Sequence, residues 1–300
     1  MAAFTPYLKW PGGKRRLAAT VGQALLDAGA RRLVDPFCGS GALFCGTEFP
    51  AYLLSDLNAD PVGCHRVAVT EPNWLVNRLR FLVVGGCTRE AYERIREAMN
   101  GELPGSAVRA PMFLYCNRAG FNGLVRYSRS GAFNVPWGKG TSVYLPADEI
   151  AAFAGKAKGC SVEFAACPWE ETLSKVEPGD GVYLDPPCLP TPGAKETFDR
   201  FGPTSFGEGD HRRLADAARE LAGRGIPVVV SGRDTPLTRE IYAGARFRAV
   251  ESASGISGKA DGRKSVGELL ALFGPLQPSS MALFWQRRTR LAVRPQPTRA

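Results

Sequence analysis

Four short apolar runs, each followed by a polar or glycine-containing turn, constrain the fold more than any other feature of this sequence. A continuous apolar run of this length is typical of a strand buried on both faces of a sheet. Helix-compatible segments separate the runs, and residues 210–225 carry leucine and alanine at helical spacing before Gly225. The pattern predicts an α/β fold with a mostly parallel sheet. The runs lie in RRLVDPFCGSGALF (31–44), AYLLSDLNAD (51–60), GVYLDPP (181–187) and IPVVVSGRD (226–234).

The strand-forming pattern is interrupted between Pro61 and Pro146. This region begins with an arginine-rich helical part and continues with NRAGFNGLVRYSRSGAFNVPWGK (117–139), which is crowded with glycine, asparagine and aromatic residues. We interpret residues 61–146 as a domain inserted into a discontinuous domain made of residues 1–60 and 147–275. Residues 276–300 are rich in proline and arginine and contain no acid, so we expect a loose basic tail.

The net charge indicates the kind of partner, and the cysteines and histidines indicate the state of the thiols and the absence of a zinc site. The net charge of +9 and the isoelectric point near 9.3 favour a polyanionic partner, because lysine and arginine exchange condensed counterions for phosphate contacts. The eight cysteines form no C-x-x-C pair and the histidines are His65 and His211 alone, so we expect reduced thiols and no zinc site. The sequence has no run typical of a signal peptide or a membrane span, so we expect a cytoplasmic protein.

Aspartates stand at the ends of three of the four predicted strands. Asp35, Asp56 and Asp185 each close an apolar run, and ligands of open α/β sheets bind beyond the carboxyl ends of the strands. We therefore expect these three carboxylates to converge on one crevice.

Two glycines, Gly39 and Gly41, follow the first predicted strand. They let the backbone approach a ligand closely, and Asp56 after the next strand is placed to bind a ribose diol. The third glycine of a dinucleotide fingerprint is missing, so the loop suits a nucleoside without a pyrophosphate. A plain strand-to-helix turn is the alternative for such a glycine pair taken alone.

Asp185 is followed by Pro186 and Pro187, so its carboxylate stands on a rigid backbone. Proline fixes φ and has no N–H group, so this segment offers hydrogen-bond acceptors. An amino group held between the Asp185 carboxylate and the Pro186 carbonyl has both protons engaged, which directs its nitrogen lone pair toward an electrophile. This suits methyl transfer to an exocyclic NH2 group. A stiff surface turn is the alternative for a lone D-P-P, but this one ends a buried strand.

Seven sequence motifs in order give the chain a family resemblance that extends to about residue 275. The chain resembles the Dam-type DNA adenine N6-methyltransferases of the D12 class. The resemblance implies a Rossmann-like domain that binds S-adenosylmethionine, with an inserted helical and hairpin domain that recognises the DNA target. The motifs are LKWPGGK (8–14), DPFCGSG (35–41), SDLN (55–58), NRAGFNGLVRY (117–127), GAFNVPWG (131–138), DPPC (185–188) and SGRDTPLTREIY (231–242).

The resemblance also implies roles for residues of the cofactor and catalytic sites. Trp10 and Lys14 would line the cofactor site, and Asp56 would bind the ribose. The methionyl end would lie near Asp35, Phe37, Gly39 and Gly41, and the catalytic segment would be Asp185, Pro186, Pro187 and Cys188, with Asp185 also near the cofactor.

The segment 117–139 suits DNA by its own chemistry, because its basic residues occur without an acid between them. Its glycines permit a hairpin, and an arginine can read guanine O6 and N7 in the major groove. A solvated charged face is the alternative. The basic residues are Arg118, Arg126, Arg129 and Lys139. The resemblance implies that Lys9 reaches DNA, that Phe121 and Asn122 are wedges, that Leu124 and Arg126 read bases, and that Arg118 and Asn134 contact phosphates.

Cys188 stands where the family usually carries an aromatic residue. An adenine must be flipped out of the duplex before its amino group can react, and a cysteine cannot stack on it as a ring does. Losing such a stack costs ~1–3 kcal/mol, unless Phe198 or Phe201 takes its place. A covalent role for Cys188, as in carbon-5 cytosine methylation, is the alternative, but the sequence identifies no partner that would activate the thiol.

These features together predict an enzyme that methylates adenine N6 in double-stranded DNA at GATC or a related short site. The alternatives are a cytosine N4-methyltransferase and a DNA-binding protein with a failed active site. We expect a bacterial or phage-encoded protein that needs no metal and acts as a monomer or as a weak dimer on DNA.

Overall fold

The computed structural model of the 300-residue chain describes residues 3–85, 87–101, 105–189, 206–252 and 266–276. The predicted basic tail, apart from Leu276, lies outside these residues, as do Phe198 and Phe201.

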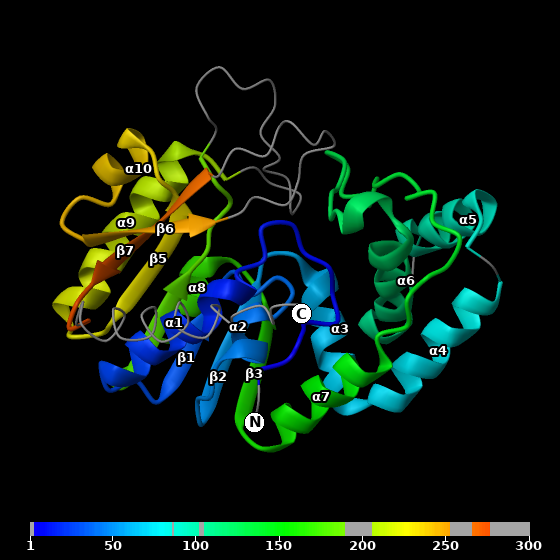
Figure 1. The fold of residues 1–300 in the computed structure, drawn as a ribbon, viewed down its shortest axis with the longest axis horizontal. Helices are drawn as coiled ribbons and strands as arrows, with labels where there is room; N and C mark the ends of the chain where they lie inside the picture. Colours follow the sequence, from blue (N-terminus) through cyan, green and yellow to red (C-terminus); the bar gives the residue numbers. More distant parts are fainter. Residues whose placement is uncertain (1–2, 86, 102–104, 190–205, 253–265, 277–300) are drawn as a thin grey trace, which may run out of the picture.

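A seven-stranded sheet in the order β3-β2-β1-β4-β5-β7-β6 forms the centre of the fold (Figure 1). The four predicted strands are confirmed as the adjacent, parallel strands β2, β1, β4 and β5, and β7 is antiparallel to both of its neighbours. The sheet is therefore mostly parallel, as predicted. The strands are β1 (Arg32–Asp35), β2 (Ala51–Asp56), β3 (Ser161–Ala166), β4 (Asp180–Leu184), β5 (Val228–Arg233), β6 (Arg246–Ser252) and β7 (Val266–Phe273).

Helices cover both faces of this sheet (Figure 1). One apolar cluster joins alternate strand residues such as Leu33 and Leu54 to α1 (Arg15–Asp27), α2 (Ala42–Gly46), α3 (Ala59–Thr70) and α7 (Ala147–Lys158). The second joins the intervening residues, such as Val34 and Leu53, to α8 (Trp169–Leu173), α9 (Glu208–Gly223) and α10 (Pro236–Ile241). This two-sided burial explains the continuous apolar runs, because successive side chains of a strand face opposite sides. The helix predicted over 210–225 is α9.

Three further helices, α4 (Pro72–Val84), α5 (Arg89–Asn100) and α6 (Ser106–Ala119), lie beside the sheet next to α3 and α7 (Figure 1). A short 3₁₀ turn, η1 (Phe121–Gly123), and an antiparallel hairpin with a bridge between Tyr127 and Phe133 follow α6. The apolar cluster that includes α3 continues into these helices. The sheet and the helices therefore share one core.

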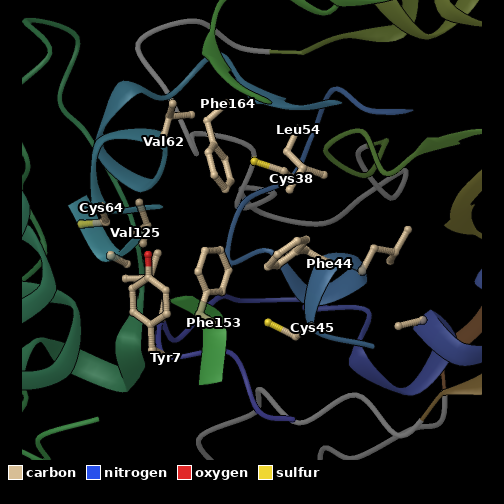
Figure 2. Packing of buried hydrophobic residues seen from close by; sticks show 14 of the residues in the cluster. Tyr7, Cys38, Phe44, Cys45, Leu54, Val62, Cys64, Val125, Phe153 and Phe164 are labelled. Atoms are coloured by element: carbon tan, nitrogen blue, oxygen red, sulfur yellow. The ribbon is translucent and has the colours of Figure 1, made fainter. Parts of the chain in front are cut away.

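Aromatic rings fill the part of this core between α2, α3 and α7. Phe153 of α7 stacks on His65 of α3 with ring centroids 5.0 Å apart. Phe153 also packs against Phe44 of α2, with ring centroids 4.7 Å apart (Figure 2). Tyr7, from the segment before α1, meets Phe153 edge-on at 5.2 Å. The residues ahead of α1 are therefore part of the core.

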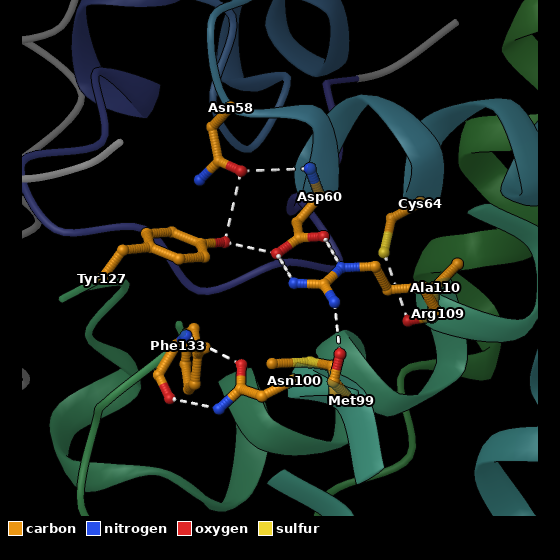
Figure 3. Close-up of polar contacts among 9 residues, drawn as sticks. All are labelled: Asn58, Asp60, Cys64, Met99, Asn100, Arg109, Ala110, Tyr127 and Phe133. Atoms are coloured by element: carbon orange, nitrogen blue, oxygen red, sulfur yellow. Dashed lines mark hydrogen bonds and ion pairs between the residues drawn. The ribbon is translucent and has the colours of Figure 1, made fainter. Parts of the chain in front are cut away.

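A polar network around Asp60 connects α3 with α5, α6 and the hairpin (Figure 3). The Asp60 carboxylate is 5% exposed and accepts hydrogen bonds from the guanidinium of Arg109 and the hydroxyl of Tyr127. Arg109 also donates to the carbonyl of Met99 at the end of α5. Asn100 pairs with both the N–H and the carbonyl of Phe133, at 2.8 and 2.9 Å. One buried carboxylate thus fixes the hairpin relative to α3.

We predict that Arg109→Ala lowers the free energy of unfolding by about 3 kcal/mol, because it leaves the buried Asp60 carboxylate without its cation. Denaturant titration measures this loss. The matched control is Arg94→Ala, which removes an exposed arginine of α5 and should change stability by about 0.5 kcal/mol or less. Equal losses in the two variants would contradict the role of the network.

Candidate functional site

The loops that follow β1 and β2 are joined by the carboxylate of Asp56. It accepts hydrogen bonds from the main-chain N–H groups of Gly39, at 2.9 Å, and Asn58, at 2.9 Å. The first loop is also held by Asp35, whose Oδ1 accepts the N–H of Phe37 at 3.1 Å. The structure thus brings the predicted Asp35, Phe37, Gly39 and Asp56 together at the carboxyl ends of adjacent strands.

The glycine loop passes directly against the indole of Trp10. Gly39 has a φ of +44°, and a Cβ on it would lie 2.7 Å from the ring. Gly41 has a φ of +71°, which favours glycine, and it precedes α2. The close approach of Trp10 explains Gly39, and the positive φ explains Gly41.

Burial changes the ionisation of the two carboxylates in these loops. It raises the pKa of Asp56 to about 6, although the N–H groups of Asn58 and Gly39 act in the opposite direction. It also raises the pKa of Asp35, with further contributions from the charges of Asp185 and Asp56. Acidic groups gathered in this way favour a ligand that carries positive charge or hydrogen-bond donors.

Asp185, directly after β4, is held by side chains from two other segments. Its Oδ1 lies 2.9 Å from Nζ of Lys14 and accepts the hydroxyl of Ser231 at 2.8 Å. Lys14 also lies 3.2 Å from Oε1 of Glu268 on β7. Burial alone would lower the pKa of Lys14, but the two carboxylates raise it above its usual value. Lys14 is therefore a cation shared by two acids.

The residues after Asp185 complete this segment. Pro186 is buried, and the carbonyl of Pro187 lies 2.9 Å from Nε2 of His211. Burial raises the pKa of the Cys188 thiol, with Lys14 acting in the opposite direction. A protonated thiol is a poor nucleophile, which counts against a covalent role for Cys188.

Sequence reasoning missed three residues of this site: Ser231, His211 and Glu268. Ser231 lies in β5 and begins the motif SGRDTPLTREIY, and its position directly after the apolar run IPVVV (226–230) was the available signal. His211 and Glu268 reach the site from α9 and β7, and no spacing in the sequence connects them with Asp185.

Buried and partly exposed residues alternate along the hairpin after α6. Val125, Tyr127, Phe133 and Val135 are buried, whereas Leu124, Arg126 and Asn134 lie between them and are partly exposed. Nε of Arg126 donates to Oδ1 of Asn134 at 2.8 Å, and Nη2 donates to the Asn134 carbonyl at 3.0 Å. Arg126 and Asn134, both predicted to contact DNA, thus share the outer face of the hairpin, whereas Leu124 packs partly against the core.

The remaining predicted DNA contacts surround this hairpin. Phe121 is 48% exposed, and Asn122 and Lys139 adopt positive φ angles of 53° and 59° without being glycine. Arg118 is more enclosed, because it donates to the carbonyl of Tyr7 and lies over the ring of Tyr144, with 5.2 Å from Cζ to the centroid.

The N-terminal segment, residues 7–10, connects the two groups of predicted residues. Lys9 exchanges two main-chain hydrogen bonds with the buried side chain of Asn117, at 2.9 and 2.8 Å. At either side of it, Trp10 packs on Gly39, and Tyr7 bonds to His65, whose other nitrogen lies 2.9 Å from the Gly39 carbonyl. The segment therefore contacts both the glycine loop and α6.

Within the described parts of the chain, no group of three or more histidine, cysteine, aspartate or glutamate residues is placed to hold a metal ion, and no helix has the length and apolar character needed to cross a membrane. All eight cysteines are free thiols.

Comparison with known proteins gives one consistent match. A family model described as D12 class N6 adenine-specific DNA methyltransferase matches residues 10–256. Three bacterial proteins named DNA adenine methylase each align with 90% of the chain. The protein from Vibrio cholerae serotype O1 is 38% identical over 96% of its own length, that from Escherichia coli K12 is 36% identical over 95%, and that from Haemophilus influenzae is 35% identical over 93%.

The pH dependence of stability tests whether His65 is buried next to the glycine loop, residues 36–41. Burial lowers its pKa to about 4, so the unfolded chain binds a proton on this side chain at a higher pH than the native protein does. The contribution of His65 to native stability therefore falls as the pH drops from about 6.5 toward 4. We predict that the titration of His65 lowers the free energy of unfolding by about 2 to 3 kcal/mol between pH 7 and pH 4.5.

Denaturant titration of the wild type and of His65→Gln at the two pH values isolates this contribution. Asp56 titrates with the opposite sign in the same window, but it is present in both proteins and cancels in the comparison. The variant should lose less stability than the wild type on acidification. The same loss in both proteins would show that His65 is not buried in its neutral form.

Proposed function

The chain belongs to the D12 class of N6 adenine-specific DNA methyltransferases, and from this premise we propose that its methyl donor is S-adenosylmethionine and its target a short palindrome, GATC or a related site. The protein is an adenine-specific DNA methyltransferase, so its substrate is DNA and its reaction requires a methyl donor. The single observation that supports the proposed site best is Asp185, an acceptor next to two prolines at the strand end where Asp35 and Asp56 also lie.

The strand-end loops fit S-adenosylmethionine by their chemistry. When bound, this cofactor supplies a methyl group on a positively charged sulfur. The gathered carboxylates suit its cationic groups, and the close contact between Gly39 and Trp10 gives the loop a flat, apolar wall. In this proposal Asp56 binds the ribose, Asp35, Phe37, Gly39 and Gly41 lie near the methionyl end, and Trp10 and Lys14 line the site.

Asp185 and its two prolines orient the amino group that receives the methyl group. The adenine amino group donates one hydrogen bond to the Asp185 carboxylate and one to the Pro186 carbonyl, so its lone pair points away from both acceptors. Ser231 and Lys14 hold the carboxylate in place from one side. Lys14 keeps a second anionic partner in Glu268 while Asp185 is engaged with the base.

The base reaches this segment by flipping out of the duplex. We propose residues 61–146 as the DNA-recognition domain and residues 1–60 with 147–275 as the catalytic domain. Phe121 and Asn122 fill the gap in the duplex, Leu124 and Arg126 read base edges, and the phosphates are contacted by Lys9, Arg118, Asn134 and Lys139. The outward face of the hairpin and the exposure of Phe121 support these roles. We propose that the protein acts as a monomer or as a weak dimer on DNA.

Asp185→Ala should abolish methyl transfer, because the amino group loses the carboxylate that orients it. Transfer of a labelled methyl group to duplex DNA measures this, and DNA affinity should remain within about threefold, since Asp185 is not proposed to touch phosphates. The matched control is Asp216→Ala, an aspartate on α9 whose side chain is 77% exposed. Turnover in Asp185→Ala close to that of the control would refute the assignment.

Arg126→Ala should relax sequence choice. One bidentate contact to guanine is worth about 1–3 kcal/mol of discrimination, so we expect the preference for the target over a single-base variant to fall by roughly 5- to 150-fold. Arg129→Ala, in the exposed turn of the same hairpin, should weaken all sequences alike if it contacts phosphate. Methylation rates on matched and mismatched duplexes decide between the two roles, and uniform weakening in Arg126→Ala would remove it from base reading.

Cys188→Ala should retain methylation, because direct transfer does not use the thiol and burial raises its pKa, which disfavours the thiolate. Cys188→Tyr should speed single-turnover methylation by restoring a ring that stacks on the base, by up to about a hundredfold. If Phe198 or Phe201 supplies that ring instead, the tyrosine collides with it and the rate falls. Complete loss of activity in Cys188→Ala, with folding and cofactor binding intact, would contradict direct transfer, especially if a protein–DNA adduct can be trapped only with the wild-type protein.

A further inference from the structure

Both histidines of the chain make the same arrangement of hydrogen bonds. His211 Nδ1 lies 2.8 Å from the hydroxyl of Tyr242, and its Nε2 lies 2.9 Å from the carbonyl of Pro187. His65 Nδ1 lies 2.7 Å from the hydroxyl of Tyr7, and its Nε2 lies 2.9 Å from the carbonyl of Gly39. Each imidazole thus connects a tyrosine to the main chain of a segment proposed to bind substrate or cofactor.

The geometry fixes which nitrogen of His211 carries the proton. A carbonyl oxygen can only accept, so Nε2 must donate to Pro187. Burial lowers the pKa of His211, which favours the neutral ring, and Nδ1 then accepts the hydroxyl proton of Tyr242. His211 is 4% exposed and Tyr242 is 2% exposed, so both bonds are shielded from water.

His211 has little freedom to move away from this position. It lies in the first turn of α9, and the Asp210 carboxylate beside it accepts the N–H of Gly207 at 2.8 Å and closes the start of the helix. Phe206 packs edge-on against the imidazole with ring centroids 5.0 Å apart, and it packs in the same way on Phe37 at 5.8 Å. The imidazole is therefore held by the start of its own helix and by the ring of Phe206.

Proline makes this bond important for the segment after Asp185. Pro186 and Pro187 have no N–H groups, so they cannot be anchored by donating main-chain hydrogen bonds. The segment is anchored instead through the carbonyl of Pro187, which accepts a hydrogen bond from His211.

We infer that His211 is a positioning residue for methyl transfer, which acts through the Pro187 carbonyl and keeps the Asp185 carboxylate and the Pro186 carbonyl in line with the adenine amino group. This inference rests on the proposed role of residues 185–188. A small displacement of reacting groups lowers a rate far more than it lowers binding, so the bond should affect the transfer step and leave cofactor and DNA affinity nearly unchanged.

Two amide substitutions that differ in reach test the bond. The side-chain nitrogen of glutamine extends to about the place of Nε2, so His211→Gln can still donate to Pro187, whereas His211→Asn is too short. We expect the single-turnover methylation rate on duplex DNA at saturating S-adenosylmethionine to fall at least tenfold in His211→Asn and to stay within about threefold of wild type in His211→Gln. The dissociation constants for S-adenosylmethionine and DNA should change by less than about threefold in both.

Tyr242→Phe is the matched control, because it disturbs the same buried site but leaves the bond to Pro187. Its rate should stay within about threefold of wild type when all variants are assayed well below their unfolding temperatures. A rate in His211→Asn equal to that of His211→Gln would overturn the inference, as would an equal loss in Tyr242→Phe.

Asp185→Ala, measured in the same series, separates this inference from the proposed site. If Asp185→Ala is inactive and His211→Asn methylates at the wild-type rate, only the positioning role of His211 is refuted. If Asp185→Ala is active, the assignment of the whole segment falls, and the role of His211 with it.

Discussion

The two hydrogen bonds between the side chain of Asn117 and the main chain of Lys9 hold the N-terminal segment in the position on which the site depends. Residues 7–10 have no helix or strand of their own, so their main-chain groups need partners from elsewhere. With Lys9 fixed against α6, Tyr7 reaches His65 and the indole of Trp10 lies close to Gly39. The glycine loop and the hairpin after α6 are thereby placed relative to each other through one short segment.

The sequence predicted those parts of the fold that follow from burial on both faces. β1, β2, β4 and β5 have continuous apolar runs because helices cover both sides of them, and their ends carried the aspartates that the structure brings together. β3 was missed because it is an edge strand in which only Phe164 is buried, and it therefore lacks such a run. The run in β7, VGELLALF, suits a helix as well as a strand, and only its pairing with β5 and β6 decides between them.

The site was predictable where a carboxylate stands directly at the end of a predicted strand, as at Asp35, Asp56 and Asp185. Ser231, Glu268 and His211 could not be assigned in the same way, because each meets the segment around Asp185 only after β5, β7 and α9 have packed. The charge distribution adds a second feature that composition conceals. The chain carries a net charge of +9, which suits DNA, yet its strand ends gather carboxylates, which suit a cationic methyl donor. The net charge and the strand-end carboxylates thus suit different substrates of the proposed reaction.

The most direct measurement is to express the protein in a host without adenine methylation and to sequence the modified positions of its DNA. N6-methyladenine on both strands of GATC or closely related sites is the result that a flipped adenine at Asp185 and base reading by Leu124 and Arg126 predict. N4-methylcytosine, or methyladenine distributed without regard to any GATC-related sequence, would contradict this account.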